Sequence, residues 1–296
     1  MGERQIPDPG RSQPINIVRA DGFSTLSWLI HGFSTRLDGV SEINGAKALN
    51  LGFTERDSRR AVEQNRSAFV RAMGAVNGSE LWPLVALRQV HSDLVHRVEG
   101  VPGKSLTGDG AITDTPGLLL AVETADCLPI ILVDPEHRAV GVFHAGWRGT
   151  LKRIVEKGVD AMRGAFLSEP SRMKAAIGPG IGACCYEVSE EVREKFESQF
   201  GYAAELFEER TERDPVREKY PLMFMSVRPP GHAEPTRKTY LDLHAANRRQ
   251  LLDAGLKENN ISALGLCTAC RTDLFFSYRA EKGHTGRQMG VVGIRQ

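Results

Sequence analysis

The sequence has no excess of charge of either sign and few cysteines. Its 296 residues carry 38 Lys and Arg against 37 Asp and Glu, a formal net charge of +1. This balance gives no bulk attraction to nucleic acid or to an anionic membrane. The five cysteines are an odd number, and Cys184 and Cys185 are adjacent, which does not suit a disulfide framework. We therefore expect a protein of the reducing cytoplasm with no nucleic-acid partner.

Long apolar runs are also missing. No segment approaches the roughly 20 apolar residues of a membrane-spanning helix, so we expect no membrane partner. The first residues, MGERQIPDPGRSQP, are polar and rich in proline, and they lack the apolar centre of a secretory signal. We expect residues 1–20 to form a loose tail.

Two kinds of metal motif are absent as well. The chain has eight histidines but no His-x-His pair, the unit from which multicopper clusters are built. The methionine ligand of an electron-transfer copper site also has no obvious candidate near Cys127. The His-x-Glu and Pro-Cys-x-x-Cys elements of zinc cytidine deaminases are missing. Copper is therefore the less favoured metal.

Helical and strand-like segments alternate irregularly along the chain. Helical spacing is found over 57–73, 150–166, 187–200 and 240–254, and strand-like runs over 82–90, 173–177, 261–266 and 290–294. No repeat or linker divides the chain, so we predict one domain over 21–296. Its predicted class is α/β of the mixed α+β kind, with packed mixed β-sheets flanked by helices. Residues 201–238, acidic and then rich in proline, are predicted to be a peripheral excursion.

Residues 117–150 hold most of the chemical information. Apolar runs at 118–122, 128–133 and 139–143 are short and rich in Val, Ile and Leu, which is typical of buried strands. An Asp-Pro turn separates the last two runs. Cys127 precedes the second run and His144 follows the third. If these runs form a hairpin, the thiol and the imidazole come within contact distance.

A neighbouring cysteine and histidine have three interpretations. They are a nucleophile with its base, two ligands of a soft metal, or a buried cysteine and a hydrogen-bonded core histidine. Gly146 and Gly149 favour the first two, because glycine lets a backbone approach a ligand closely. His91, at the end of a predicted strand, would complete a His-Cys-His set with an open fourth position, which is typical of catalytic zinc.

The remaining motifs are weaker. Cys267 and Cys270 form a CxxC, but a zinc ribbon needs a second pair at suitable spacing, and none is found. The segment that follows, 274–277, looks like a strand, unlike the helix of a thioredoxin-type motif. Cys184 and Cys185 follow a Gly-Pro-Gly turn and could face the same site. For both pairs we favour a structural role.

The glycine-rich turns match no standard phosphate motif. Residues 178–183, GPGIGA, have no Walker lysine and depart from the GxGxxG pattern. Several such turns are flanked by arginine, namely Arg36, Arg148, Arg279 and Arg287. A phosphate or ribose partner is one interpretation, since backbone N–H groups can bind an anion, and solvated arginine is the other.

Taken together, several segments resemble the laccase-domain or polyphenol-oxidase-like family. That family is also described as peptidoglycan editing factors and as purine nucleoside phosphorylases with adenosine deaminase activity. The matching segments include HGFSTRLDGVS (31–41), RQVHSD (88–93), GDGAITDTPG (108–117), ETADCLPI (123–130), FHAGWRG (143–149), IGPGIGACCYEV (177–188) and FFSYRAEKGHTGRQM (275–289). The 201–238 excursion departs from the family pattern, and so does Gln64, where an acidic residue is expected.

The resemblance implies a single α/β domain and a cytoplasmic enzyme that acts on purine nucleosides. The implied reactions are phosphorolysis of adenosine, inosine, guanosine and methylthioadenosine, and hydrolytic deamination of adenosine. Their small-molecule partners would be the nucleoside and phosphate. A metal, zinc in preference to copper, is implied at His91, Cys127 and His144.

For this chemistry we assign catalytic roles to Cys127, His144 and Asp126, the last as a side chain that orients a ligand histidine. Substrate positioning is assigned to Arg36, Gln89 and Arg148. Three alternatives stay open: a hydrolase with Cys127 as nucleophile and His144 as base, an enzyme that edits peptidoglycan precursors, and a binding protein without turnover. Copper-dependent polyphenol oxidation is disfavoured by the missing His-x-His pairs.

Overall fold

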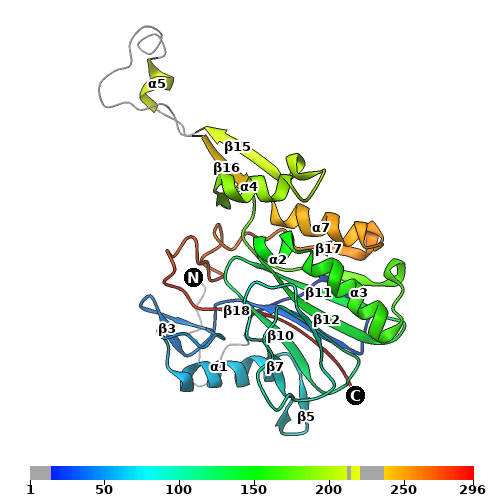
Figure 1. Ribbon diagram of the computed structural model, residues 1–296. Coiled ribbons are helices and arrows are strands. Elements are labelled where there is room, and N and C mark those ends of the chain that lie inside the picture. The colour runs from blue at the N-terminus through cyan, green and yellow to red at the C-terminus, as the bar shows by residue number, and fades with distance from the viewer. Residues whose placement is uncertain (1–14, 212–214, 221–236) are drawn as a thin grey trace, which may run out of the picture.

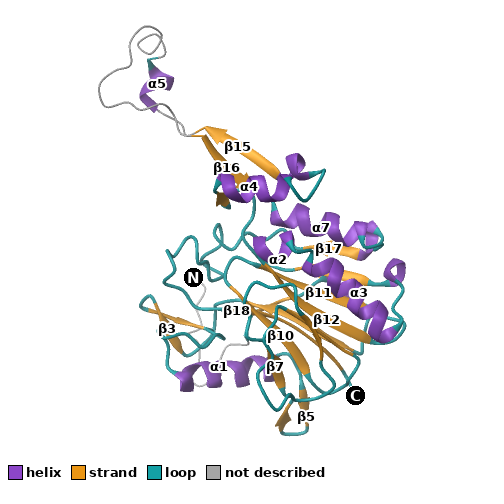
Figure 2. Ribbon diagram, in the orientation of Figure 1, coloured by secondary structure: helices purple, strands orange, loops and turns teal. Residues whose placement is uncertain are grey.

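The computed structural model describes residues 15–211, 215–220 and 237–296. In these residues two large β-sheets lie face to face, and Figure 1 shows helices on the outer side of each. Helix α1 (Arg59–Ala72) covers one sheet, whereas α3 (Ile154–Phe166) and α7 (Leu243–Asp253) cover the other. The predicted class, mixed α/β with packed sheets flanked by helices, is confirmed (Figure 2).

The first large sheet has five strands and is mixed. Its order is β1 (Ile17–Val18), β2 (Leu29–Ser34), β18 (Gln288–Ile294), β10 (Leu119–Thr124) and β7 (Leu84–Ala86). β10 runs antiparallel to β18 and parallel to β7. Alternate side chains of β10 face opposite layers: Leu119 and Ala121 pack on the α1 side, and Leu120 and Val122 pack between the sheets.

The second large sheet has six strands and contains the predicted hairpin. Its order is β17 (Ile261–Ala263), β13 (Lys174–Ile177), β11 (Leu128–Asp134), β12 (Ala139–Ala145), β9 (Gly110–Thr113) and β8 (Val95–Arg97). Ile130 and Leu132 face α3 and α7, and Ile131 and Val133 face the first sheet. Because both faces of β11 are buried, the strand reads as an unbroken apolar run instead of an alternating one.

The helices are bounded by recognisable local features. The Ser58 hydroxyl accepts a hydrogen bond from Ala61 N at 3.1 Å and caps α1, and the Asp242 carboxylate accepts from Ala245 N at 2.8 Å and caps α7. The helix predicted over 150–166 is two helices, α2 (Trp147–Leu151) and α3. They are separated because Arg153 adopts a left-handed backbone with φ 62°, which interrupts the helical hydrogen-bond ladder.

Three smaller sheets complete the described part of the chain. They are β3 (Ser41–Ile43) with β4 (Ala46–Ala48), β5 (Val76–Asn77) with β6 (Glu80–Leu81), and β14 (Glu187–Val188), β16 (Arg237–Leu241) and β15 (Phe207–Thr211). The helix predicted over 187–200 is shorter, α4 (Glu190–Glu197), because its first residues pair as β14 with β16. The strand predicted over 274–277 is wrong, since these residues form turns and coil.

The hairpin of β15 and β16 projects from the body, with α5 (Pro215–Lys219) beyond it (Figure 1). It belongs to the excursion predicted over 201–238, of which residues 212–214 and 221–236 lie outside the described residues. Of the tail predicted over 1–20, residues 1–14 also lie outside them, and Ile17 and Val18 pair with β2. Among the described helices, none has the length and apolar character needed to cross a bilayer.

Candidate metal centre

The hairpin of β11 and β12 brings Cys127 and His144 together, as the sequence predicts. In its antiparallel register Pro129 lies opposite His144, so Cys127, two residues before Pro129, lies close to that histidine. His91 reaches the same point from the segment after β7. One ligand atom from each of His91, Cys127 and His144 lies within 4.8 Å of the others. The distance from Cys127 Sγ to His91 Nε2 is 3.8 Å.

A buried carboxylate, Asp109, organises both histidines. Its Oδ1 accepts hydrogen bonds from His144 Nδ1 at 2.8 Å and from the His91 backbone N–H at 3.0 Å. Its Oδ2 accepts from Ser92 N at 2.6 Å, Ser92 Oγ at 2.7 Å and Val90 N at 3.2 Å. Asp109 is fully buried. These bonds hold His91 in a left-handed backbone conformation, φ 55°, which is uncommon for a non-glycine residue.

The charges at the centre support one another. Burial disfavours the ionised Asp109 carboxylate, but its hydrogen bonds from His144 and Ser92 outweigh burial and hold its pKa far below the usual range. Burial likewise opposes charge on Cys127 and His144. Their mutual attraction prevails and lowers the pKa of Cys127 to about 6, while that attraction and Asp109 raise the pKa of His144 to about 9. Both shifts favour a thiolate facing an imidazolium when no metal is bound.

Gly146 makes room for this cluster. A Cβ atom at this position would lie 2.7 Å from Cys127 Sγ and 3.2 Å from His91 Cδ2. Real Cβ atoms essentially never approach other heavy atoms within 3.0 Å. The glycine predicted to allow close approach is therefore required by the cysteine and histidine themselves.

The donor set fits a metal ion. Imidazole nitrogen and thiolate sulfur are both ordinary zinc ligands, and three protein ligands leave one position open. Because Nδ1 of His144 is bonded to Asp109, Nε2 is the atom left to act as ligand. This carboxylate–histidine arrangement is the usual support of a metal-bound imidazole. A metal site at the predicted residues is thus consistent with their chemistry and positions.

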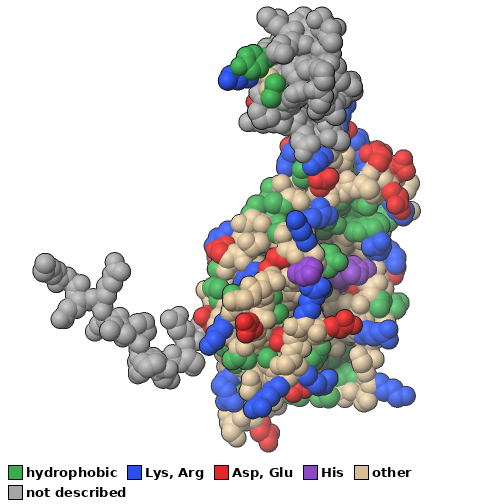
Figure 3. Space-filling view, turned by 90° about the vertical axis from the view of Figure 1, so that its left-hand side faces the viewer, with side chains coloured by type: hydrophobic (Ala, Val, Ile, Leu, Met, Phe, Trp, Pro, Cys, Tyr) green, Lys and Arg blue, Asp and Glu red, His purple; other side chains and the backbone are tan. Residues whose placement is uncertain are grey.

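A cavity of about 670 Å³ adjoins the cluster. Ligand sites for small molecules usually have 300–1,000 Å³. Aromatic side chains line it at Trp147, Tyr186 and Tyr278, and charged ones at Arg88, Glu123, Arg279 and Arg287. Histidine side chains reach the surface of the face shown in Figure 3, with basic side chains next to them. The cavity therefore offers flat apolar surfaces and charged groups beside a candidate metal.

Glu123 contributes an acidic group to this mostly basic lining. Its Oε1 lies 2.5 Å from Arg66 Nη2, and Arg66 lies over the ring of Phe53, 4.3 Å from its centroid. Burial raises the pKa of Glu123 above its usual value, although Arg66 and Arg287 oppose the shift. The carboxylate is fixed in place and can accept a hydrogen bond from a ligand.

The residues predicted to position substrate are not all at the cavity. Gln89 lines it, but the Gln89 amide is engaged with the β10 backbone: Nε2 donates to Glu123 O at 2.8 Å, and Oε1 accepts from Glu123 N at 2.7 Å. Arg36 and Arg148 are missing from the described residues that line it. Arg36 pairs with Glu281 at 3.0 Å, and Arg148 lies 4.2 Å from the centroid of the Trp147 ring.

Asp126 lines the cavity but does not hold a histidine. Its carboxylate accepts hydrogen bonds from Thr268 Oγ1 and from Arg279 N, both at 2.7 Å. The carboxylate that contacts a histidine of the cluster is that of Asp109, which lies 2.8 Å from His144 Nδ1. Asp109 belongs to a Gly-Asp-Gly sequence before a buried strand, and an acidic residue between two glycines at a strand end was the available signal. Tyr186, Tyr278 and Glu123 carried no comparable signal.

Known proteins resemble this chain along most of its length. A family model described as multi-copper polyphenol oxidoreductase laccase matches residues 30–295. The chain belongs to this family. It is 37% identical over 265 residues to a protein from Deinococcus radiodurans named purine nucleoside phosphorylase, covering 89% of this chain and 88% of that one. It is 33% identical over 280 residues to purine nucleoside phosphorylase YlmD of Geobacillus stearothermophilus, covering 90% of each.

Solved structures of family members share the fold. The YlmD structure from Geobacillus stearothermophilus superposes with a TM-score of 0.75 and 30% identity, covering 98% of this chain and 100% of that one. The structure of YfiH, titled a hypothetical protein, from Bacillus licheniformis gives a TM-score of 0.78 and 29% identity, covering 96% and 97%. The architecture is therefore that of this laccase-domain family along nearly its whole length.

Proposed function

We propose that the protein is a zinc-dependent purine nucleoside enzyme. Its reactions would be phosphorolysis of adenosine, inosine, guanosine and methylthioadenosine, and hydrolytic deamination of adenosine. The observation that carries this proposal is the His91–Cys127–His144 cluster beside a cavity lined by aromatic rings and charged groups. The names of the relatives from Deinococcus and Geobacillus support the same substrate class.

The cluster residues have defined tasks in this proposal. His91, Cys127 and His144 would hold the zinc, and Asp109 would fix the orientation and tautomer of His144. When bound at such a site, zinc supplies a Lewis acid and lowers the pKa of a coordinated water towards 7. The buried Asp109 keeps its negative charge at neutral pH and so favours a positive charge in the cluster.

The cavity residues would bind the nucleoside. The rings of Trp147, Tyr186 and Tyr278 offer surfaces on which a purine stacks, a contact worth about 1–3 kcal/mol per base. Glu123 can accept a hydrogen bond from a ribose hydroxyl or a base amino group. The guanidinium groups of Arg88, Arg279 and Arg287 match the charge of phosphate, which arginine binds through two parallel hydrogen bonds.

The direct test is product analysis. Zinc-loaded protein is incubated with adenosine, with and without phosphate, and the products are separated by chromatography. Inosine formation indicates deamination, and adenine formed only with phosphate indicates phosphorolysis. The Cys127→Ala variant should lose both metal at this centre and turnover. Full activity in that variant, or no product from zinc-loaded wild-type protein, would refute the proposal.

A second candidate is a hydrolase with Cys127 as nucleophile and His144 as base. The opposite pKa shifts of the two side chains favour it, because they produce a thiolate beside an imidazolium. Alkylation by iodoacetamide distinguishes the candidates. A hydrolase would be inactivated by alkylation of Cys127 and would need no metal, whereas a zinc ligand is protected while zinc is bound.

A further inference from the structure

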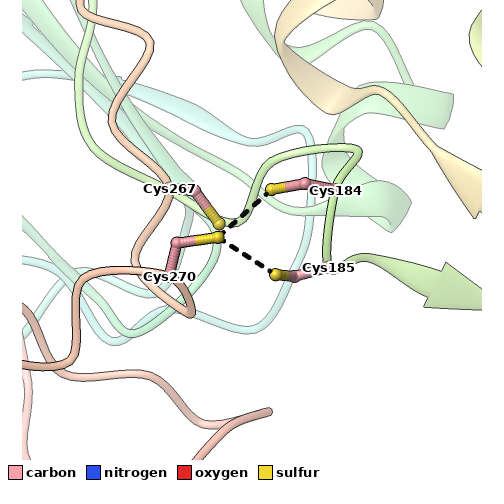
Figure 4. A group of neighbouring side chains, drawn as sticks. All are labelled: Cys184, Cys185, Cys267 and Cys270. Carbon is pink, nitrogen blue, oxygen red and sulfur yellow. Dashed lines mark hydrogen bonds between the residues drawn. The ribbon is translucent and has the colours of Figure 1, made fainter.

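Outside the cavity lining, the structure brings four cysteine side chains together. Figure 4 shows the side chains of Cys184, Cys185, Cys267 and Cys270 pointing towards one another from two loops. All four are free thiols, and their sulfur atoms lie within 4.8 Å of one another. The second pair that the CxxC was predicted to lack is the adjacent pair Cys184–Cys185, on a loop more than 80 residues earlier in the chain.

The spacing of the sulfur atoms suits a single metal ion. Cys270 Sγ lies 3.4 Å from Cys184 Sγ and 3.4 Å from Cys185 Sγ. A disulfide would require about 2.05 Å. Four sulfurs placed tetrahedrally at about 2.3 Å from zinc would be about 3.8 Å apart. The observed cluster is therefore close to the size of a ZnS₄ tetrahedron.

The backbone around the cluster is arranged for thiolate ligands. The N–H of Gly182 donates to Cys267 Sγ at 3.3 Å, and backbone donors of this kind stabilise the negative charge of coordinating sulfur. A Cβ on Gly182 would lie 3.3 Å from both Cys184 Sγ and Cys267 Cβ, tighter than nine in ten real Cβ contacts. Arg210 Nη1 donates to the Cys184 carbonyl oxygen at 3.1 Å, and the same guanidinium pairs with Glu208 at 2.5 Å.

We propose that Cys184, Cys185, Cys267 and Cys270 form a tetrathiolate zinc centre that joins the two loops. Tetrahedral sites with four sulfur ligands are typical of structural zinc, because they leave no open position for a substrate. The evidence for this second centre does not rest on the nucleoside chemistry proposed above, since the centre shares no ligand with the His91–Cys127–His144 cluster.

The joined loops support the cavity. Thr268 N donates to Gly180 O at 3.0 Å, which already pairs the loops next to the cysteines. Tyr186, one residue after Cys185, lines the cavity. Zinc bound between the loops would hold this tyrosine and the Asp126 contacts in place, so its removal should lower the melting temperature of the protein.

The test counts metal in the full chain. Zinc and iron are measured by elemental analysis in zinc-replete wild-type protein and in two variants with the same chemical change, Cys270→Ser and Cys127→Ser. Cys270 is solvent-exposed, so serine there leaves no core cavity. We expect two zinc ions per wild-type chain and one in each variant. After cobalt substitution, Cys270→Ser should lose most of the thiolate-to-cobalt absorption, and Cys127→Ser should keep most of it.

Equal zinc content in wild-type and Cys270→Ser protein would overturn the proposal, and so would iron in place of zinc. If Cys270→Ser does not fold, thiol titration of wild-type protein decides. The exposed Cys184 and Cys270 should react slowly with Ellman's reagent in zinc-loaded protein and rapidly after chelation. Immediate reaction of zinc-loaded protein without zinc release would refute the centre. These measurements of metal content and thiol reactivity remain valid even if the protein turns over no nucleoside.

Discussion

Replacing Asp109 with asparagine tests how the candidate metal centre is held. The substitution keeps the shape of the side chain but changes one oxygen into an amino group. In the wild-type protein, Asp109 Oδ1 accepts hydrogen bonds from His91 N and His144 Nδ1. Asp109 Oδ2 accepts them from Val90 N, Ser92 N and the Ser92 hydroxyl. Whichever way the amide points, its N–H groups face backbone donors, namely His91 N in one orientation and Val90 N with Ser92 N in the other. Those donors lose their acceptor inside the protein.

The expected loss of unfolding free energy follows from the donors left without an acceptor. A buried donor without an acceptor costs about 1–3 kcal/mol, and removal of one partner of a buried charge pair costs about 3–5 kcal/mol. We therefore expect Asp109→Asn to lower the unfolding free energy by about 3–5 kcal/mol. Loss of the carboxylate that orients a ligand histidine typically weakens metal binding about 10–100-fold, and the same loss is expected for zinc at this centre.

The effect should be measured at neutral pH. Because the pKa of Asp109 in the folded protein lies far below the ordinary value of 3.8, its stabilisation is fully present above that value. It is lost only as the pH falls below 3.8 towards the depressed pKa. The difference in unfolding free energy between wild-type and Asp109→Asn protein should therefore have its full size at pH 7 and become smaller in strong acid. Urea denaturation of the chelated proteins gives the free energies.

Asp134→Asn is the matched control. Asp134 is also buried and accepts from His137 Nδ1 at 2.7 Å and from Glu136 N at 2.8 Å. It ends β11 at the opposite end from Cys127, about 20 Å away along the strand. This variant should lose stability but keep the wild-type zinc affinity in a competition with a chelator. Cys127→Ser protein, which lacks a ligand of this centre, gives the background signal. Wild-type zinc affinity in Asp109→Asn would refute the role given to Asp109.

Three other experiments test the cluster and the cavity. Gly146→Ala should weaken zinc binding by at least about tenfold, because its methyl group would lie 2.7 Å from Cys127 Sγ; unchanged affinity in the same competition would contradict this. In metal-free protein, alkylation of Cys127, followed by peptide mass spectrometry, should rise with a midpoint near pH 6 and be suppressed by zinc. A midpoint near the ordinary value of 9.0 would exclude the thiolate–imidazolium pair. Glu123→Gln should raise the KM for nucleoside about tenfold, equivalent to about 1.4 kcal/mol of binding, with unchanged zinc content; a loss of zinc would instead place Glu123 in the metal centre.

The sequence predicted the parts of the site that local patterns determine. Apolar runs separated by an Asp-Pro turn indicated β11 and β12, and a hairpin of two adjacent strands leaves little choice in register. That register alone places Cys127 near His144. His91 was predicted at a strand end, and the order β10–β7 in the first sheet brings it to the same edge. Short-range chain geometry was sufficient for Cys127 and His144, whereas the position of His91, 36 residues from Cys127, depends on the pairing of β7 with β10.

The parts that were missed depend on contacts between distant segments. Asp109 lies 35 residues from His144, and its role depends on which strands are neighbours in the six-stranded sheet. The four-cysteine cluster joins loops through Cys184 and Cys270, 86 residues apart, and an adjacent pair of cysteines matches no regular ligand spacing. The break at Arg153 was missed because a single left-handed residue leaves the apolar periodicity of the flanking helices intact.

Asp126 links the His91–Cys127–His144 cluster to the cluster of four cysteines. It immediately precedes Cys127 and has a positive backbone φ of 93°, a conformation that costs a non-glycine residue about 1–3 kcal/mol and persists only where its surroundings hold it. Three contacts fix it here: its carbonyl accepts from Ile181 N at 2.7 Å, and its carboxylate accepts from Thr268 Oγ1 and Arg279 N. Ile181 and Thr268 belong to the two loops that carry the four cysteines. These contacts tie the residue before Cys127 to both loops, and we therefore propose that Asp126 positions the Cys127 side chain without contacting the histidines.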